Sequence, residues 1–123
     1  MGSILQQFCL AIRDYEGKPG DRNYRNNNPG NCRYSKIGYA PKYGIVRKDK
    51  DGFAIFEDYE TGWLYLLNLV RGIAKQRPEW TIVDFFKRYA PSTDGNDPAR
   101  YAAYVAQRLS VDVSSWKIKN LID

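Results

Sequence analysis

The chain has 123 residues, a mass of 14.2 kDa and a formal net charge of +5. Hydrophobic residues make up 43% of it and charged residues 27%, which favours one soluble globular domain, residues 1–123, over a disordered or coiled-coil chain. The chain has no histidine and only two cysteines, which excludes histidine acid–base catalysis and nearly every zinc site. We therefore expect no metal and no cofactor, and carboxylates lead among the candidate catalytic groups.

The positive charge is dispersed along the chain. A basic protein suits an anionic partner such as nucleic acid, a membrane surface or a bacterial cell wall. The densest cluster, residues 47–51, alternates in sign, which is typical of a solvated hairpin tip and argues against nucleic acid as the partner. No apolar run has the length of a signal peptide or a membrane span. We expect synthesis in the cytosol without a signal peptide, no membrane insertion and a monomer.

A helix is predicted first, over residues 3–16. Ser3 and Gln6 have the spacing of a capping box, and apolar residues recur on one face of the helix. Gly17 is expected to end the helix, and Cys9 to be a buried free thiol. Residues 17–31 are rich in glycine, proline and asparagine without apolar periodicity, which predicts a long loop with a tight turn at Pro29-Gly30.

A small antiparallel sheet is predicted next, followed by several helices. Strands are expected at residues 43–46 and 53–56, joined by a turn at Asp51-Gly52. Asp58, Thr81 and Asp97 each have the position of a helix cap, which predicts helices over residues 58–76, from 81, and 97–109. Ser114 or Ser115 is a candidate cap for a last short helix. The order indicates an α+β fold, mainly helical with a small hairpin sheet.

Glu16 is the leading candidate for catalysis. It lies at the C-terminal end of the first predicted helix and at the edge of its apolar face. Partial burial and the negative end of the helix dipole both favour the protonated form of a carboxyl there, which is the form that a general acid needs. The alternative is a surface glutamate paired with Arg13 or Lys18. Asp49, Asp51, Glu57 and Asp58 are weaker candidates for a second carboxylate, because turn and cap roles already explain Asp51 and Asp58.

The asparagine-rich run that follows is the candidate binding segment. Side-chain amides both donate and accept hydrogen bonds, which suits the hydroxyl and N-acetyl groups of sugars. The alternative is that these asparagines only shape the loop. Tyrosines in polar context offer rings on which sugars stack, although each is also explained as a structural residue. These tyrosines are Tyr24, Tyr34, Tyr39 and Tyr43.

Four segments in this order resemble a family of small phage virion-associated proteins. They are residues 15–17 (Tyr-Glu-Gly), 25–31 (Arg-Asn-Asn-Asn-Pro-Gly-Asn), 51–56 (Asp-Gly-Phe-Ala-Ile-Phe) and 60–63 (Glu-Thr-Gly-Trp). The Asn-Asn-Asn-Pro-Gly-Asn run is the most specific, and residues 89–91, 94–98 and 101–105 also fit. The same order is similar to lytic transglycosylases and to flagellar-type β-N-acetylglucosaminidases. The resemblance covers residues 4–112.

The resemblance implies a lysozyme-like fold and cleavage of the β-1,4 bond between N-acetylated sugars of peptidoglycan. It assigns the general acid to Glu16 and places Tyr89 in the substrate cleft. The candidate substrate-binding residues are then Tyr89 and, from the amide chemistry above, Asn26, Asn27, Asn28 and Asn31, of which Asn28 can shape the loop while Asn26 or Asn27 contacts the sugar. With one glutamate, it implies attack by the substrate's own N-acetyl group. Peptidoglycan or chitooligosaccharide is the implied partner, at the cell wall or in a virion. Many lytic transglycosylases have serine directly after the catalytic glutamate, whereas this chain has Gly17 after Glu16. A catalytically inactive virion structural or wall-binding protein of the same fold is the alternative.

Overall fold

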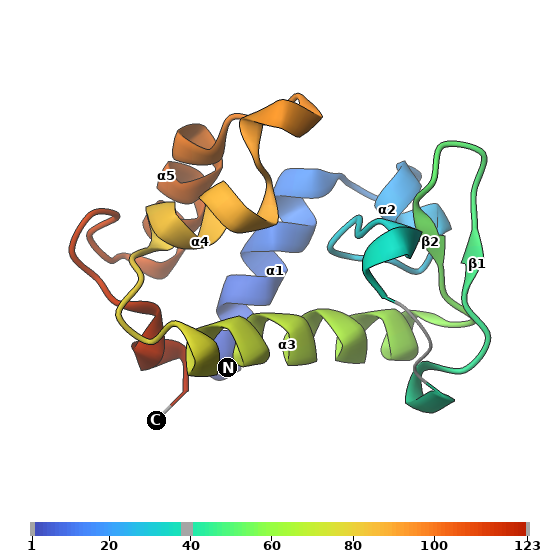
Figure 1. The fold of residues 1–123 in the computed structure, drawn as a ribbon, viewed down its shortest axis with the longest axis horizontal. Helices are drawn as coiled ribbons and strands as arrows, with labels where there is room; N and C mark the ends of the chain where they lie inside the picture. The colour runs from blue at the N-terminus through green and yellow to red at the C-terminus, as the bar shows by residue number, and fades with distance from the viewer. Residues whose placement is uncertain (1, 38–40, 123) are drawn as a thin grey trace. The chain divides into compact units, whose positions relative to one another are not determined.

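The computed structural model describes residues 2–37 and 41–122 (Figure 1). The described residues form mainly helices and one two-stranded antiparallel sheet, which confirms the α+β expectation at that level. Their contacts divide the chain into two compact units, and each is described by itself below. The first unit contains residues up to Ala11 and from Leu69 onward, and the second contains Ile12–Asn68. The boundaries fall inside the helices α1 (Ile4–Glu16) and α3 (Tyr59–Gln76).

The predicted caps of the four longest helices are confirmed in the structure. The Gln6 amide donates to Ser3 Oγ at the start of α1, and the Ser3 amide donates to Gln6 Oε1. Asp58 accepts hydrogen bonds from the amide and the hydroxyl of Thr61 at the start of α3. Helix α4 (Ile82–Tyr89) begins at a reciprocal capping box of Thr81 and Asp84. Helix α5 (Pro98–Leu109) begins at Asp97 with proline in its first turn.

The first unit has an aromatic core between the start of α1 and the helices α4 and α5. The Phe8 ring packs edge-on against Phe85 with ring centres 5.2 Å apart, and Phe86 stacks on Tyr101 at 4.2 Å. All four side chains are fully buried. The last described segment is the 3-10 helix η4 (Ile118–Leu121). The prediction that Ser114 or Ser115 caps it is wrong, because both hydroxyls instead donate to the Asp112 carboxylate.

The second unit is built around a short hairpin. Strands β1 (Arg47–Lys48) and β2 (Ala54–Ile55) pair antiparallel, with Arg47 opposite Ile55. The predicted turn at Asp51-Gly52 is confirmed, and Gly52 has the left-handed φ of +93° that a glycine provides. The unit also contains the short helix α2 (Arg22–Arg25) and the 3-10 helices η1 (Tyr34–Lys36) and η2 (Pro41–Tyr43).

Two sequence predictions in the second unit are wrong for physical reasons. Residues 43–46 are not a strand: Tyr43 ends η2, Gly44 turns the backbone to φ +69°, and the Ile45 amide donates to Glu57 Oε1 instead of to a neighbouring strand. Residues 17–31 are not entirely loop, since they contain α2. Its four residues are too few to show an apolar period in the sequence.

Candidate active site

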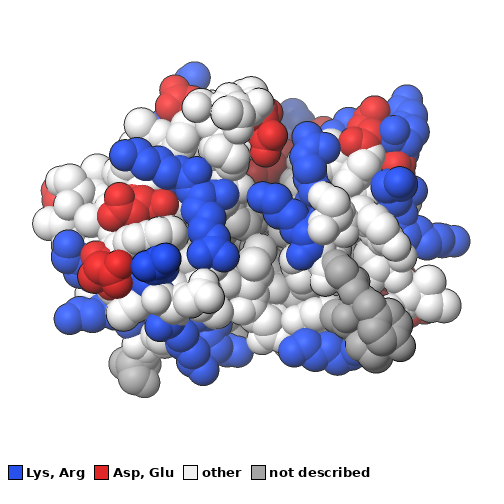
Figure 2. Space-filling view, in the orientation of Figure 1, with Lys and Arg blue, Asp and Glu red and all other residues white. Residues whose placement is uncertain are grey.

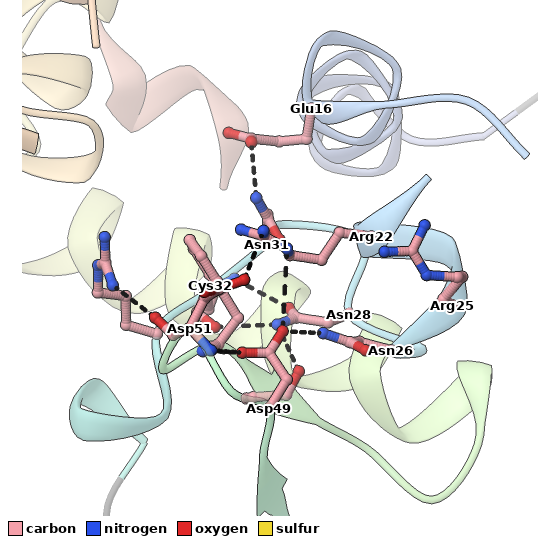
Figure 3. Close-up of polar contacts among 12 residues, drawn as sticks. Glu16, Arg22, Arg25, Asn26, Asn28, Asn31, Cys32, Asp49 and Asp51 are labelled. Carbon is pink, nitrogen blue, oxygen red and sulfur yellow. Dashed lines mark hydrogen bonds and ion pairs between the residues drawn. The ribbon is translucent and has the colours of Figure 1, made fainter. Parts of the chain in front are cut away.

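Glu16 is the last residue of α1 and is half-buried. Asn31 Nδ2 donates a long hydrogen bond of 3.4 Å to Glu16 Oε1 (Figure 3). The structure therefore brings together two of the residues that the sequence singled out, although 14 residues separate them in the chain. Arg13, offered above as an ion-pair partner of Glu16, forms a salt bridge of 3.0 Å with Asp14.

The backbone at Asn31 explains why this position is an asparagine. Its φ is +51°, a left-handed conformation that asparagine tolerates better than other residues with a Cβ atom. The backbone amide of Asn31 donates to the Asn28 carbonyl at 2.8 Å, which closes the turn at Pro29-Gly30. Asn31 Oδ1 is buried without a hydrogen-bond partner. The turn thus aims the amide group of Asn31 at the end of α1.

Asn28 fixes this loop on the hairpin. Its side chain is 1% exposed, and its Nδ2 donates to the carbonyls of Cys32 and Ala54, both at 2.9 Å. Its Oδ1 accepts from the Cys32 amide at 3.0 Å (Figure 3). A buried amide is costly unless it is hydrogen-bonded, and these three bonds satisfy the Asn28 side chain with backbone groups. Asn28 therefore has a structural role in positioning Asn31.

Asn26 and Asn27 also direct their amides to the hairpin. Asn26 Nδ2 donates to Asp49 Oδ2 at 3.0 Å, and Asn27 Nδ2 donates to the Phe56 carbonyl at 3.2 Å. The Phe56 amide in turn donates to the Asn26 carbonyl. Both side chains thus join the loop to the hairpin, as the loop-shaping alternative expects. Among the predicted binding asparagines, Asn31 is the one whose side-chain amide meets Glu16.

Asn23 was missed at the sequence level and connects the end of α1 to the loop. It is 1% exposed, and its Nδ2 donates to the carbonyls of Arg13 and Pro29 at 3.1 and 3.2 Å. Its Oδ1 lies so close to Gly17 that a Cβ atom at position 17 would overlap it. This contact accounts for a glycine at position 17. The only sign in the sequence that another side chain lies close to the end of α1 is the glycine directly after Glu16.

The candidate second carboxylates are engaged at the hairpin and at the start of α3. Asp51 forms a salt bridge of 3.0 Å with Arg22, and Asp49 Oδ1 accepts from the amides of Asp51 and Phe53 (Figure 3). Partial burial acts against ionisation of Asp49, but hydrogen bonds from Phe53, Asn26 and Asp51 outweigh it and hold its pKa below the ordinary value. The hydroxyl and amide of Thr61 likewise lower the pKa of Asp58. Each of these carboxylates thus has a structural role.

The candidate tyrosines are dispersed. Tyr89 ends α4 in the first unit, where its ring stacks on Phe85 at 5.4 Å and meets Phe86 edge-on. Tyr43 is buried against Tyr65, whereas Tyr34 is 40% exposed. Tyr24 is half-buried, with the Arg13 guanidinium 5.8 Å from its ring centre. Tyr39 lies outside the described residues.

Other kinds of site find little support in residues 2–37 and 41–122. No group of three or more Cys, Asp or Glu side chains is arranged there to hold a metal ion, and no helix is long and apolar enough to span a membrane. Cys9 and Cys32 are buried and are not joined by a disulfide, as expected for Cys9. On the face drawn in Figure 2, Lys and Arg are spread widely and mixed with fewer Asp and Glu. No family model, curated protein or solved structure matches the chain.

Proposed function

We propose that this protein has a lysozyme-like fold and cleaves the β-1,4 glycosidic bond of peptidoglycan, with Glu16 as the general acid, in a phage or prophage setting. The observation that carries the proposal is the pairing of Glu16 with Asn31 at the end of α1. A carboxyl group at a helix C-terminus is disfavoured in its charged form, so helix stability does not account for a glutamate at this position. The role of a general acid beside an oriented amide accounts for it.

The hydrogen bond from Asn31 determines which oxygen of Glu16 can donate. When the carboxyl is protonated, the Asn31 amide donates to the carbonyl oxygen Oε1, so the proton resides on Oε2. Glu16 then transfers this proton to the glycosidic oxygen as the bond between that oxygen and the anomeric carbon breaks. The carbonyl oxygen of the substrate's N-acetyl group attacks the anomeric carbon. Water, or the 6-hydroxyl of the same sugar, subsequently opens that intermediate and returns a proton to Glu16.

The first test compares wild type with Glu16→Gln on purified sacculi. Glutamine has the shape of glutamate and can still accept from Asn31 through its carbonyl oxygen, but it cannot deliver a proton. We expect release of soluble muropeptides to fall at least 100-fold, since a general acid typically contributes about 10²–10⁴-fold. The matched control is Glu60→Gln, an exposed glutamate in the first turn of α3, which should keep wild-type release. Equal release by wild type and Glu16→Gln would disprove the role of Glu16.

A second candidate function is a wall-binding or virion structural protein without turnover. This function is favoured because Asp49, Asp51 and Asp58 all take part in structural hydrogen bonds or salt bridges. None of these three carboxylates is therefore assigned as a second catalytic acid. This function predicts that wild type binds sacculi and releases nothing soluble. Mass spectrometry of the digest separates the remaining outcomes, because hydrolysis leaves a reducing sugar and attack by the 6-hydroxyl leaves an anhydro-sugar.

A further inference from the structure

The first unit gathers positive charge from two distant parts of the chain. Residues 75–88 and 116–121 together contain six Lys and Arg against two carboxylates, a net charge of +4, whereas the first unit as a whole has nine Lys and Arg against six Asp and Glu. One of the two carboxylates, Asp84, is part of the capping box of α4. The salt bridges Arg13–Asp14, Arg22–Asp49 and Arg22–Asp51 involve none of these six cations. None of these ion pairs therefore offsets the charge of the two segments.

Backbone hydrogen bonds hold the two segments against each other. The Ile118 amide donates to the Trp80 carbonyl at 2.8 Å, and the Lys119 amide donates to the Pro78 carbonyl at 3.2 Å. Lys117 forms an antiparallel bridge with Thr81. Ile118 is fully buried while Lys117 and Lys119 are exposed, so the two lysines flank the residue that anchors the segment. The C-terminal segment thus adds two cations beside the end of α3.

Cations from α3 and α4 complete this group. Lys75 lies in the last turn of α3, Arg77 follows it with its guanidinium 5.6 Å from the Trp80 ring centre, and Arg88 Nη1 donates to Gln76 Oε1 at 3.3 Å. All three are exposed. We define the cation surface as Lys75, Arg77, Arg88, Lys117 and Lys119. In Figure 2, Lys and Arg predominate at the lower left, where Figure 1 draws the end of α3 and the C-terminal segment.

Helix stability alone does not account for this surface. The C-terminus of a helix carries a partial charge of about −0.5, which favours one or two nearby cations. Five cations around the end of α3 exceed that charge and repel one another at low ionic strength. Such an arrangement is stable when an anionic partner supplies the opposite charge. Exposed lysines with long, flexible side chains suit a partner whose charges are not arranged in one rigid pattern.

We propose that the cation surface binds the carboxylate-bearing stem peptides of peptidoglycan and so holds the enzyme on its polymeric substrate. This partner rests on the proposed function, since the glycan that Glu16 would cleave carries those peptides. The surface acts in binding and leaves the bond-breaking step to Glu16. Its contribution is electrostatic, so salt weakens it.

The test uses the full chain with Glu16→Gln, so that sacculi are bound without being degraded. In this background the variant Lys75→Gln, Lys117→Gln, Lys119→Gln is compared with Lys18→Gln, Lys36→Gln, Lys50→Gln. The control removes the same charge from three exposed lysines of the second unit. Sedimentation with sacculi whose stem peptides carry free carboxylates measures affinity. We expect the first triple variant to bind at least tenfold more weakly, and the control to stay within twofold of its parent.

A second substrate identifies the ligand. Sacculi whose free carboxylates are converted to neutral methylamides keep their glycan strands and peptide cross-links, and we expect the Glu16→Gln protein to bind them at least tenfold more weakly. Equal loss in both triple variants, full binding to the amidated sacculi, or tighter binding to single-stranded DNA than to sacculi would each overturn the proposal. Turnover by wild type is measured separately. A protein that binds through these lysines but cleaves nothing refutes the glycosidase alone.

Discussion

The pairing of Glu16 with Asn31 depends on a single unusual backbone conformation. Asn31 holds φ +51°, and its amide is the only part of its side chain that meets Glu16 in the described contacts. Under the proposed function this contact gives Asn31 a role in positioning Glu16, and its predicted role in substrate binding stays a prediction. The sequence could indicate that asparagine is frequent in such conformations, but not which of five neighbouring asparagines would face the helix end.

Two substitutions distinguish the contribution of the Asn31 side-chain amide from that of the Asn31 backbone conformation. Asn31→Gly keeps the left-handed conformation without strain and removes the amide, so we expect muropeptide release to fall about tenfold with little change in the unfolding midpoint. Asn31→Ala also removes the amide, but its Cβ atom is strained at this φ, so we expect it to be less stable than Asn31→Gly by about 1 kcal/mol. Thermal unfolding and release assays on both variants check this. Full activity in Asn31→Gly would contradict the positioning role.

At the scale of elements, local signals predicted the long helices and failed at the first strand of the hairpin. Ser3, Asp58, Thr81 and Asp97 begin their helices through bonds to residues three positions away, so sequence spacing is sufficient. Strand β1 instead depends on distant groups. Gly44 and the Glu57 side chain keep Ile45 out of the sheet, and the strand forms at Arg47–Lys48, two charged residues without a strand signal.

Gly62 shows how a helix and a loop constrain each other within the second unit. It is buried in α3, and a Cβ atom there would overlap the backbone carbonyl of Asn27, itself held at φ +53°. We expect Gly62→Ala to destabilise the protein by about 2–3 kcal/mol, because either the helix or the asparagine loop must move. Chemical denaturation measures the change.

The matched control lies on the same helix. Gly72 is exposed, and no atom lies within 4 Å of where its Cβ atom would be. We expect Gly72→Ala to stabilise the protein by about 0.5–1 kcal/mol, because alanine is the better helix former. Similar effects at both positions would mean that the contact with Asn27 is not tight. Loss of activity in Gly62→Ala together with its loss of stability would connect this contact to the loop that presents Asn31.

At the scale of the molecule, the sequence predicted the fold class and the order of the helices better than it predicted which residues share a surface. The α+β class and the helix order followed from patterning. The cation surface did not, because Lys117 and Lys119 lie about 40 residues after Lys75 and Arg77 in the chain, and backbone bonds to Trp80 and Pro78 hold their segment beside the end of α3. The net charge of +5 does not indicate where on the surface the charges lie, because that depends on the fold. The same is true of Asn23, whose contacts with Arg13 and Pro29 span the end of a helix and a turn.

The dependence of the free energy of unfolding on pH is another property of the whole chain. Asp58 and Asp112 have pKa values below the ordinary value because neighbouring threonine or serine hydroxyls and backbone amides donate to them, and in Asp49 similar bonds outweigh the opposing effect of burial. A lowered pKa in the folded state means that the folded state binds fewer protons than the unfolded one. The stabilisation is complete above the ordinary value of about 3.9 and is lost as pH falls through the lower folded value.

We therefore expect the thermal midpoint of the wild type to be flat near neutral pH and to fall below about pH 4. Asp58→Asn isolates one contribution, because asparagine caps a helix as well as aspartate but does not titrate in this range. At pH 7 this variant should unfold at a slightly lower temperature, since it loses the charge that favours a helix N-terminus. As the pH falls through the lowered pKa of Asp58 the two midpoints should converge, because Asp58 becomes protonated in the folded wild type. Curves that stay parallel from pH 7 to pH 2 would show that Asp58 contributes no charge-dependent stability.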